Sequence, residues 1–235
     1  MVLAITDKSQ SRKSSVVGDQ SLRFASFIHP DRFAPFLEAT GLDSAKAVNL
    51  YMWNIEVSSA FWGGFHLLEV SIRNAIHTKF VEHAVMEEWW EADIPIHDAE
   101  RDSIFEAQRK VSALQDAPTP GHVIAELHFG FWVSLFANNY HSALWVNRLE
   151  NAFPNYSGTR KDLHVDLERL RKLRNRIAHH EPIYRRDLRF DFQLICSVIR
   201  YIDNDISELV YSLSRVEEVI EKKNHRIDGI IGLSF

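Results

Sequence analysis

Hydrophobic side chains recur every three or four residues along most of the chain, which is the spacing of one face of an α-helix. The longest run of this kind extends from about Ala45 to Ala84. A glycine pair within it, at 63–64, is expected to bend the helix or to admit another backbone. The apolar positions of the run are Leu50, Trp53, Ile55, Val57, Phe61, Phe65, Leu68, Ile72, Ile76 and Phe80. Because neither an alternating strand pattern nor a solenoid repeat interrupts this spacing, the chain is predicted to be all-α.

Proline and glycine residues divide the rest of the chain into shorter predicted helices. The first has Asp31 as its N-cap and ends at Gly41, and Ser44 is expected to cap the long helix. An acidic stretch at 85–103 predicts the end of the long helix and a loop. Further helices are expected at about 98–115, 122–137, 139–152, 159–180, 187–203 and 205–223.

The predicted domain organisation is simple. Residues 1–20 are polar and without periodicity, and are expected to form a flexible N-terminal segment. A single helical domain is predicted over residues 21–224, followed by a C-terminal tail at 225–235.

The predicted helix at 159–180 is strongly amphipathic and ends close to two histidines. Its apolar stripe is Leu163, Leu167, Leu170, Leu173 and Ile177. Pro182 cannot continue the helix, so His179 and His180 are expected in its final turn. There the unsatisfied carbonyls favour a protonated imidazole.

Composition indicates an ordinary globular protein, with 46% hydrophobic and 25% charged residues among 235. Cys196 is the one cysteine, which excludes a disulfide within the chain and suits a reducing compartment. The first residues do not have the pattern of a signal peptide, and no uncharged apolar run reaches transmembrane length. The sequence therefore predicts a cytoplasmic protein without membrane association.

Charge is distributed unevenly along the chain. Residues 160–189 carry ten Lys or Arg against five Asp or Glu, although the formal net charge of the whole chain is −5. Residues 82–103 carry eight acidic residues and one basic one. The basic segment has two interpretations: a footprint for a phosphate backbone, or a solvated helix face with pairs such as Glu168–Lys172.

Arg174, Asn175 and His179 form the group of side chains best suited to catalysis. Asn175 and His179 are four residues apart and share a helix face, with Arg174 about 100° from Asn175. A guanidinium neutralises a phosphate, and an imidazole moves protons to or from a ribose hydroxyl or a leaving oxygen. This set of side chains suits RNA cleavage.

The segment around these residues, LRNRIAHHEPIYRRDL at 173–188, resembles the signature of the Abi-like (abortive infection) family in the HEPN superfamily of helical RNA-cutting domains. Residues 50–76 are similar to the family's N-terminal helix, and residues 126–132 to its central Phe-Gly motif. The superfamily pattern is an arginine, four to six residues, and a histidine, which Arg174 and His179 match. The resemblance covers roughly residues 25–220.

This resemblance implies a HEPN-like helical bundle with additional helices, acting as a homodimer. It also implies a metal-independent endoribonuclease without cofactors, in which the 2′-OH attacks the adjacent phosphate. The expected role is a toxin of a toxin–antitoxin or anti-phage system, restrained by a protein or small-RNA antitoxin. The alternative is a non-catalytic RNA-binding or protein-interaction module on the same scaffold.

Several further residues are candidates for supporting roles. His180 is an alternative to His179, and Glu69 either pairs with Arg73 as helix support or orients the site. A second string, Arg73-Asn74-Ala75-Ile76-His77, has only three intervening residues, so it is either a second half-site or structural. The aromatic residues at 89–90 and 129–132 have two interpretations: they stack on bases if they are exposed, or they belong to the core if they are buried. The remaining candidates are Arg176 beside the catalytic set and, for RNA contacts, Arg171, Lys172, Arg185 and Arg186.

Overall fold

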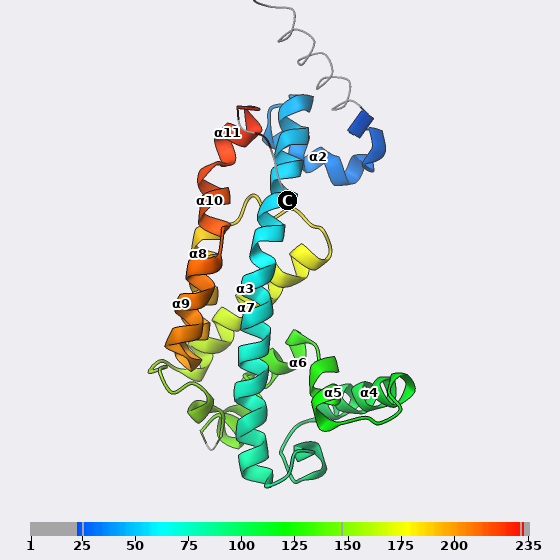
Figure 1. Cartoon of the computed structure of the whole chain (residues 1–235), viewed down its shortest axis with the longest axis vertical. Helices are drawn as coiled ribbons and strands as arrows, with labels where there is room; N and C mark the ends of the chain where they lie inside the picture. The colour runs from blue at the N-terminus through cyan, green and yellow to red at the C-terminus, as the bar shows by residue number, and fades with distance from the viewer. Residues whose placement is uncertain (1–22, 25, 147, 231, 233–235) are drawn as a thin grey trace, which may run out of the picture. The chain divides into compact units, whose positions relative to one another are not determined.

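The computed structural model describes residues 23–24, 26–146, 148–230 and 232, and over these residues the chain is helical with no strand (Figure 1). This confirms the predicted all-α class. The predicted flexible segment at 1–20 and residues 231 and 233–235 of the predicted tail lie outside the described residues.

The α-helices are α2 (Pro30–Ala39), α3 (Ser44–Ala84), α4 (Asp98–Leu114), α5 (Pro120–Glu126), α6 (Phe129–Ser134), α7 (Arg160–Ala178), α8 (Leu188–Ile202), α9 (Asn204–Leu213), α10 (Val216–Glu221) and α11 (Lys223–Ile227). Tighter or wider turns form η1 (Trp89–Glu91), η2 (Asn138–Tyr140), η3 (His141–Trp145) and η4 (Leu149–Ala152). Among the described helices none combines the length and the apolar character needed to cross a membrane.

The chain forms two compact units, and α3 contributes to both. Unit 1 comprises the described residues of 1–60, together with 182–186 and those of 215–235. Unit 2 comprises 61–181 and 187–214. The expectation of a single domain from residue 21 to residue 224 remains a prediction.

Unit 1 is built around aromatic contacts between α2 and the first part of α3. The rings of Phe36 and Tyr51 are 4.9 Å apart, and Tyr184 packs on Phe36 at 5.0 Å. The Tyr184 hydroxyl donates to the Pro35 carbonyl at 2.6 Å, which fixes the 182–186 segment to α2.

Polar contacts hold the C-terminal helices of unit 1 against α3. Trp53 Nε1 donates to the Val219 carbonyl at 2.9 Å, and the buried Glu56 carboxylate pairs with Arg226 at 2.6 Å. Breaking a buried pair of this kind is strongly destabilising, because it leaves a charge without its partner in a low dielectric. Arg226 is therefore firmly anchored.

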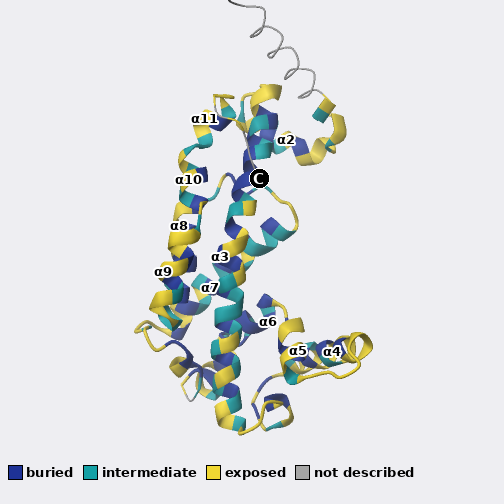
Figure 2. Cartoon of the chain, viewed as in Figure 1, coloured by how far each residue is buried: buried dark blue, intermediate teal, exposed yellow. Residues whose placement is uncertain are grey.

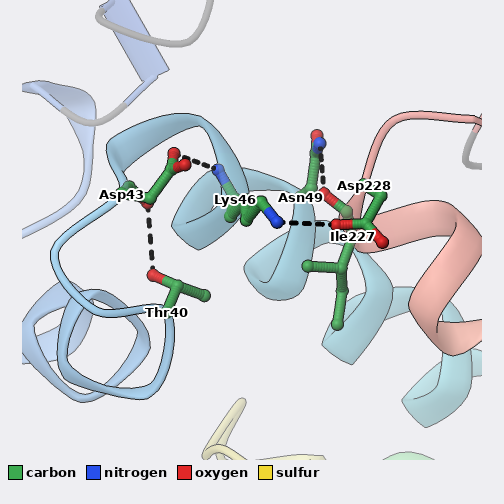
Figure 3. Close-up of polar contacts among 6 residues, drawn as sticks. All are labelled: Thr40, Asp43, Lys46, Asn49, Ile227 and Asp228. Carbon is green, nitrogen blue, oxygen red and sulfur yellow. Dashed lines mark hydrogen bonds and ion pairs between the residues drawn. The ribbon is translucent and has the colours of Figure 1, made fainter.

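The start of α3 is tied to the end of α11, as Figure 3 shows. Lys46 Nζ lies 2.7 Å from Asp228 Oδ1, and Asn49 Nδ2 donates to the Ile227 carbonyl at 3.0 Å. Asp43 Oδ1 accepts from the Lys46 N–H at 3.0 Å. The predicted cap at Ser44 is therefore wrong by one residue, because Asp43 caps the helix and Ser44 is its first member.

Unit 2 buries the apolar faces of α3, α7 and α8 against one another. Along α3, buried residues alternate with exposed ones in helical register (Figure 2). The predicted apolar positions of α3 in unit 2, from Phe61 to Phe80, are all buried, and those in unit 1 are buried except Ile55, which is half-buried. The predicted stripe of α7 is confirmed, since all five of its apolar residues are buried. A Cβ on Gly64 would lie 3.5 Å from Ile195 Cγ2, so this glycine admits a side chain of α8 rather than a backbone.

Three of the predicted helices are not continuous, in each case because a local cap or turn interrupts the periodicity. The expected helix at 122–137 is broken where Leu127 is extended and His128 Nδ1 caps α6 by accepting from the Phe131 N–H at 3.0 Å. The expected helix at 139–152 is a series of 3₁₀ and π turns. The expected helix at 205–223 ends at an extended Ser214 and restarts as α10. At α2, His29 rather than Asp31 is the N-cap.

Candidate functional site

Helix α7 is fixed at its N-terminus, which sets the direction of its polar face. Thr159 caps the helix by accepting from the Asp162 N–H at 3.2 Å. The buried Arg160 donates to the Phe136 carbonyl, and its Nη2 donates to Asn138 Oδ1 at 3.1 Å. Since the leucine stripe is buried in unit 2, the polar residues of α7 project from its remaining sides.

Arg174 is held against α3 by an ion pair with Glu69. Its Nε donates to Glu69 Oε1 at 2.8 Å, and the side chains of the two residues are 30% and 27% exposed. The Arg174 guanidinium carbon lies 5.9 Å from the centre of the Trp62 ring. The hydrogen bond to Glu69 uses Nε and does not involve the two Nη atoms, which form the fork that binds a phosphate. The structure thus brings Arg174, Glu69 and Trp62 together.

The C-terminus of α7 is a Schellman motif built without glycine. The helix ends at Ala178, and His179 is the C-cap residue, donating its N–H to the Asn175 carbonyl at 2.9 Å. His180 has a φ of +57°, and its N–H donates to the Ile177 carbonyl at 3.0 Å. The Glu181 N–H closes the motif on the Arg176 carbonyl at 2.8 Å. The prediction that both histidines lie in the last turn is therefore wrong for His180, which lies past the helix, whereas His179 is the C-cap that closes this turn.

The side chains at this end of α7 lie on different sides of the helix. His179 and His180 are exposed, and Asn175 is half-buried. Arg176 Nε pairs with Glu181 Oε2 at 3.3 Å, which places Arg176 beside the Schellman turn. Arg174 and His179 are five residues apart, which corresponds to about 140° around a helix axis. Arg174 is directed toward α3, whereas His179 lies at the C-terminal end of α7 as its C-cap residue.

The second Arg…His string makes contacts of a structural kind. Arg73 Nε donates to Asn74 Oδ1 at 3.3 Å, and His77 Nδ1 accepts from Trp89 Nε1 at 3.1 Å. Burial lowers the pKa of His77, and the nearby Arg73 lowers it further, whereas Glu87 raises it. A half-buried imidazole that accepts from a core tryptophan favours the neutral form. These contacts favour the structural interpretation of the string.

The predicted RNA-contacting residues are divided between the two units. Arg171 on α7 donates to Glu168 at 2.9 and 2.8 Å, a pairing that raises the pKa of Arg171 and lowers that of Glu168. Lys172 is exposed on the same helix. Arg185 and Arg186 belong to unit 1, where the Arg185 guanidinium lies 5.4 Å from the Tyr184 ring.

The sequence argument did not identify Trp62 as a site residue. Trp62 falls inside an apolar run and is 41% exposed, whereas Trp89, Trp90 and Trp132, which were considered for base stacking, are buried in the core. The sequence feature that could have identified Trp62 is its position seven residues before Glu69, which puts both side chains on one face of α3.

The chemistry available at this site is that of a positioned guanidinium, an exposed indole and exposed imidazoles at a helix end. Over the described residues, no group of three or more His, Cys, Asp or Glu side chains is arranged to hold a metal ion. A cavity of about 280 Å³ between α4 and α5 is lined by residues such as Glu106, Lys110 and Glu126, and it is separate from this site. Comparison with protein-family models, with curated proteins and with solved structures finds no match to this chain.

Proposed function

We propose that this chain is a metal-independent endoribonuclease with Arg174, Asn175 and His179 as its catalytic set. One observation carries the proposal: Glu69 orients the Arg174 guanidinium at 2.8 Å while the side chain stays 30% exposed. The positioned side chain is thus not closed off from a ligand in solution. The exposed His179 at the end of the same helix supplies an imidazole, a group that can accept a proton and donate one.

The proposed reaction is an internal transfer at phosphorus. The ribose 2′-oxygen attacks the adjacent phosphate, the bond to the 5′-oxygen of the next nucleotide breaks, and a 2′,3′-cyclic phosphate and a 5′-hydroxyl result. His179 takes the 2′-OH proton or delivers one to the leaving 5′-oxygen. Arg174 neutralises the charge that builds on the phosphate, and Asn175 holds a neighbouring side chain in position. DNA is not a substrate because it lacks the attacking hydroxyl.

The separation of Arg174 and His179 around α7 supports a site that is completed by a second copy of the chain. In a symmetric homodimer, the arginine of one copy meets the histidine of the other near the two-fold axis. The like charges of two Arg174 side chains repel there, so a bound phosphate stabilises the dimer. Arg171, Lys172, Arg176 and His180 lie on the same helix or at its end and serve as supporting groups.

The resemblance of residues 173–188 to the Abi-like family supports a biological role as a toxin. In that role the protein cuts cellular RNA in the cytoplasm in response to phage or loss of an antitoxin, which is a protein or a small RNA. Induced expression of the wild-type chain in a bacterial host is then expected to arrest growth, and the Arg174→Ala variant is expected to allow growth.

The product ends test the proposed chemistry. The substrate is a pair of single-stranded RNA oligonucleotides, one of which has a single 2′-deoxy nucleotide 5′ to the mapped cleavage point. We expect cleavage of the all-ribose oligonucleotide to leave a cyclic phosphate and a 5′-hydroxyl, and the deoxy substitution to block cutting at that point. RNA that is bound and left intact would support the non-catalytic RNA-binding module instead.

A further inference from the structure

Trp62 is the exposed member of a set of tryptophans that are otherwise buried. The chain has six tryptophans, and Trp53, Trp89, Trp90, Trp132 and Trp145 are at most 9% exposed, whereas Trp62 is 41% exposed. Leaving an indole in water forgoes the favourable burial of a large apolar surface. The neighbouring Gly63 has open space where a side chain would be, so the surface beside Trp62 is uncrowded.

An arginine of α7 lies beside the Trp62 ring. The guanidinium carbon of Arg174 is 5.9 Å from the ring centre, near the outer limit of a cation–π contact. Arg171, one turn before Arg174 on the same side of α7, is paired with Glu168. An aromatic face next to a guanidinium is the combination that binds a nucleotide, because the ring stacks on the base and the cation holds the phosphate.

We propose that Trp62 is a base-stacking platform and that the site accepts single-stranded RNA. The inference rests on the proposed function and names its substrate class. A nucleobase stacks on the indole while Arg174 holds the adjoining phosphate. Bases in a duplex are stacked on one another, which covers their faces, so a duplex offers no base face to Trp62.

A second exposed aromatic with an arginine above it provides a matched control. Phe190 is 45% exposed, and the Arg169 guanidinium carbon lies 4.5 Å from its ring centre. Arg169 is bound to the buried Asp191 at 2.6 Å and is five residues from Arg174, which is about 140° around α7. Phe190→Ala thus removes a similar aromatic surface away from the proposed site.

The test measures binding to a short single-stranded RNA with 2′-O-methyl groups at every position, which prevents cleavage, and to the duplex of the same sequence. Because Trp62 is the exposed tryptophan, a base stacked on it is expected to quench the tryptophan fluorescence of the protein. The bound RNA is also expected to protect Trp62 from acrylamide, so that acrylamide quenches less of the remaining fluorescence. Trp62→Ala is expected to weaken binding of the single strand at least about five-fold, and Trp62→Phe to retain most affinity without the fluorescence change. Phe190→Ala is expected to bind as the wild type does.

The outcomes separate this inference from the proposed function. Wild-type protein that binds the single strand without a change in acrylamide quenching overturns the stacking role, and this measurement needs no variant to fold. Equal affinity for single strand and duplex also overturns it. If the wild type cuts RNA and the Trp62→Ala variant cuts it equally fast, only the stacking role is refuted. If RNA stacks on Trp62 but all-ribose RNA stays intact, only the nuclease activity is refuted.

Discussion

Arg174 Nε donates a 2.8 Å hydrogen bond to Glu69 Oε1, which joins two residues 105 positions apart in the sequence. Both side chains are partly exposed, so the pair adds at most about 1 kcal/mol to the free energy of unfolding. Its main consequence is to fix the guanidinium in one orientation. Glu69 is therefore a positioning residue for the proposed phosphate contact.

The first prediction concerns Glu69. We expect Glu69→Ala to lower kcat for RNA cleavage by about ten-fold, because the guanidinium is no longer oriented for the phosphate. Glu69→Gln keeps an oxygen acceptor for Arg174 Nε and should restore most of the rate. Thermal melting of both variants is the control for folding. Faster cleavage by Glu69→Ala would contradict the positioning role, because it would mean that the carboxylate competes with the substrate.

The second prediction concerns the left-handed residue at the end of α7. A side chain at φ +57° costs about 1–2 kcal/mol that glycine avoids. His180→Gly should therefore be more stable than His180→Ala by about 1 kcal/mol, as measured by urea denaturation. If His179 is the acid or base, both variants should keep their RNase activity. Loss of cleavage in both would assign the proton transfer to His180.

The third prediction is a pH dependence of stability that comes from His77. Its pKa is lowered in the folded protein, mainly by burial, so the unfolded chain binds more protons than the folded one as pH falls below about 6.5. The neutral His77 contributes its full share to the free energy of unfolding above that pH. This contribution is lost as the pH falls toward the lower pKa of His77 in the folded protein. His77→Gln can still accept from Trp89 Nε1, and we expect its melting temperature to fall less between pH 7 and pH 5.

A second histidine provides an internal comparison for this pH effect. Burial also lowers the pKa of His164, so this residue contributes with the same sign. The variant with both His77→Gln and His164→Gln should show a flatter pH profile than His77→Gln alone. Equal slopes in the wild type and the double variant would exclude both histidines as the source.

The fourth prediction tests whether the site is shared between two copies. Arg174→Ala and His179→Ala proteins are each expected to be inactive. When the two are mixed and allowed to exchange, heterodimers carry one intact arginine and one intact histidine facing each other, and activity should partly return. Mixtures that remain inactive while mass measurements show heterodimers would place both residues of a working site in one chain.

Long periodic segments were predicted well from the sequence because their signal is repeated many times. Helix α3 extends from Ser44 to Ala84, close to the expected range, and the buried stripe of α7 is the expected one. The region from 122 to 152 was not predicted, because a side-chain cap at His128 and short 3₁₀ and π turns leave no periodic pattern. In such a region the local hydrogen bonds of single residues decide the structure.

The candidate site was predictable only in part. The spacing of Arg174 and His179 made them candidates, and Pro182 indicated the end of α7 to within two residues. The sequence offered Glu69 either as a partner of Arg73 or as a residue that orients the site. Its pairing with Arg174 was not predictable, because periodicity shows that each residue is polar on its own helix and says nothing of how two helices pack. The role of Trp62 was hidden for the same reason, since one exposed aromatic in an apolar run follows the same spacing as the core.

The most direct test of the central claim is the rate of RNA cleavage by purified protein in excess EDTA, with His179→Ala as the paired sample. His179 is exposed beyond the last turn of α7, so its loss should change the free energy of unfolding by no more than about 1 kcal/mol. Loss of a positioned acid or base should slow cleavage by roughly 10²–10⁴. We predict metal-free cleavage by the wild type and almost none by the variant. Equal rates for the two folded proteins would contradict the assignment of His179 as a catalytic residue.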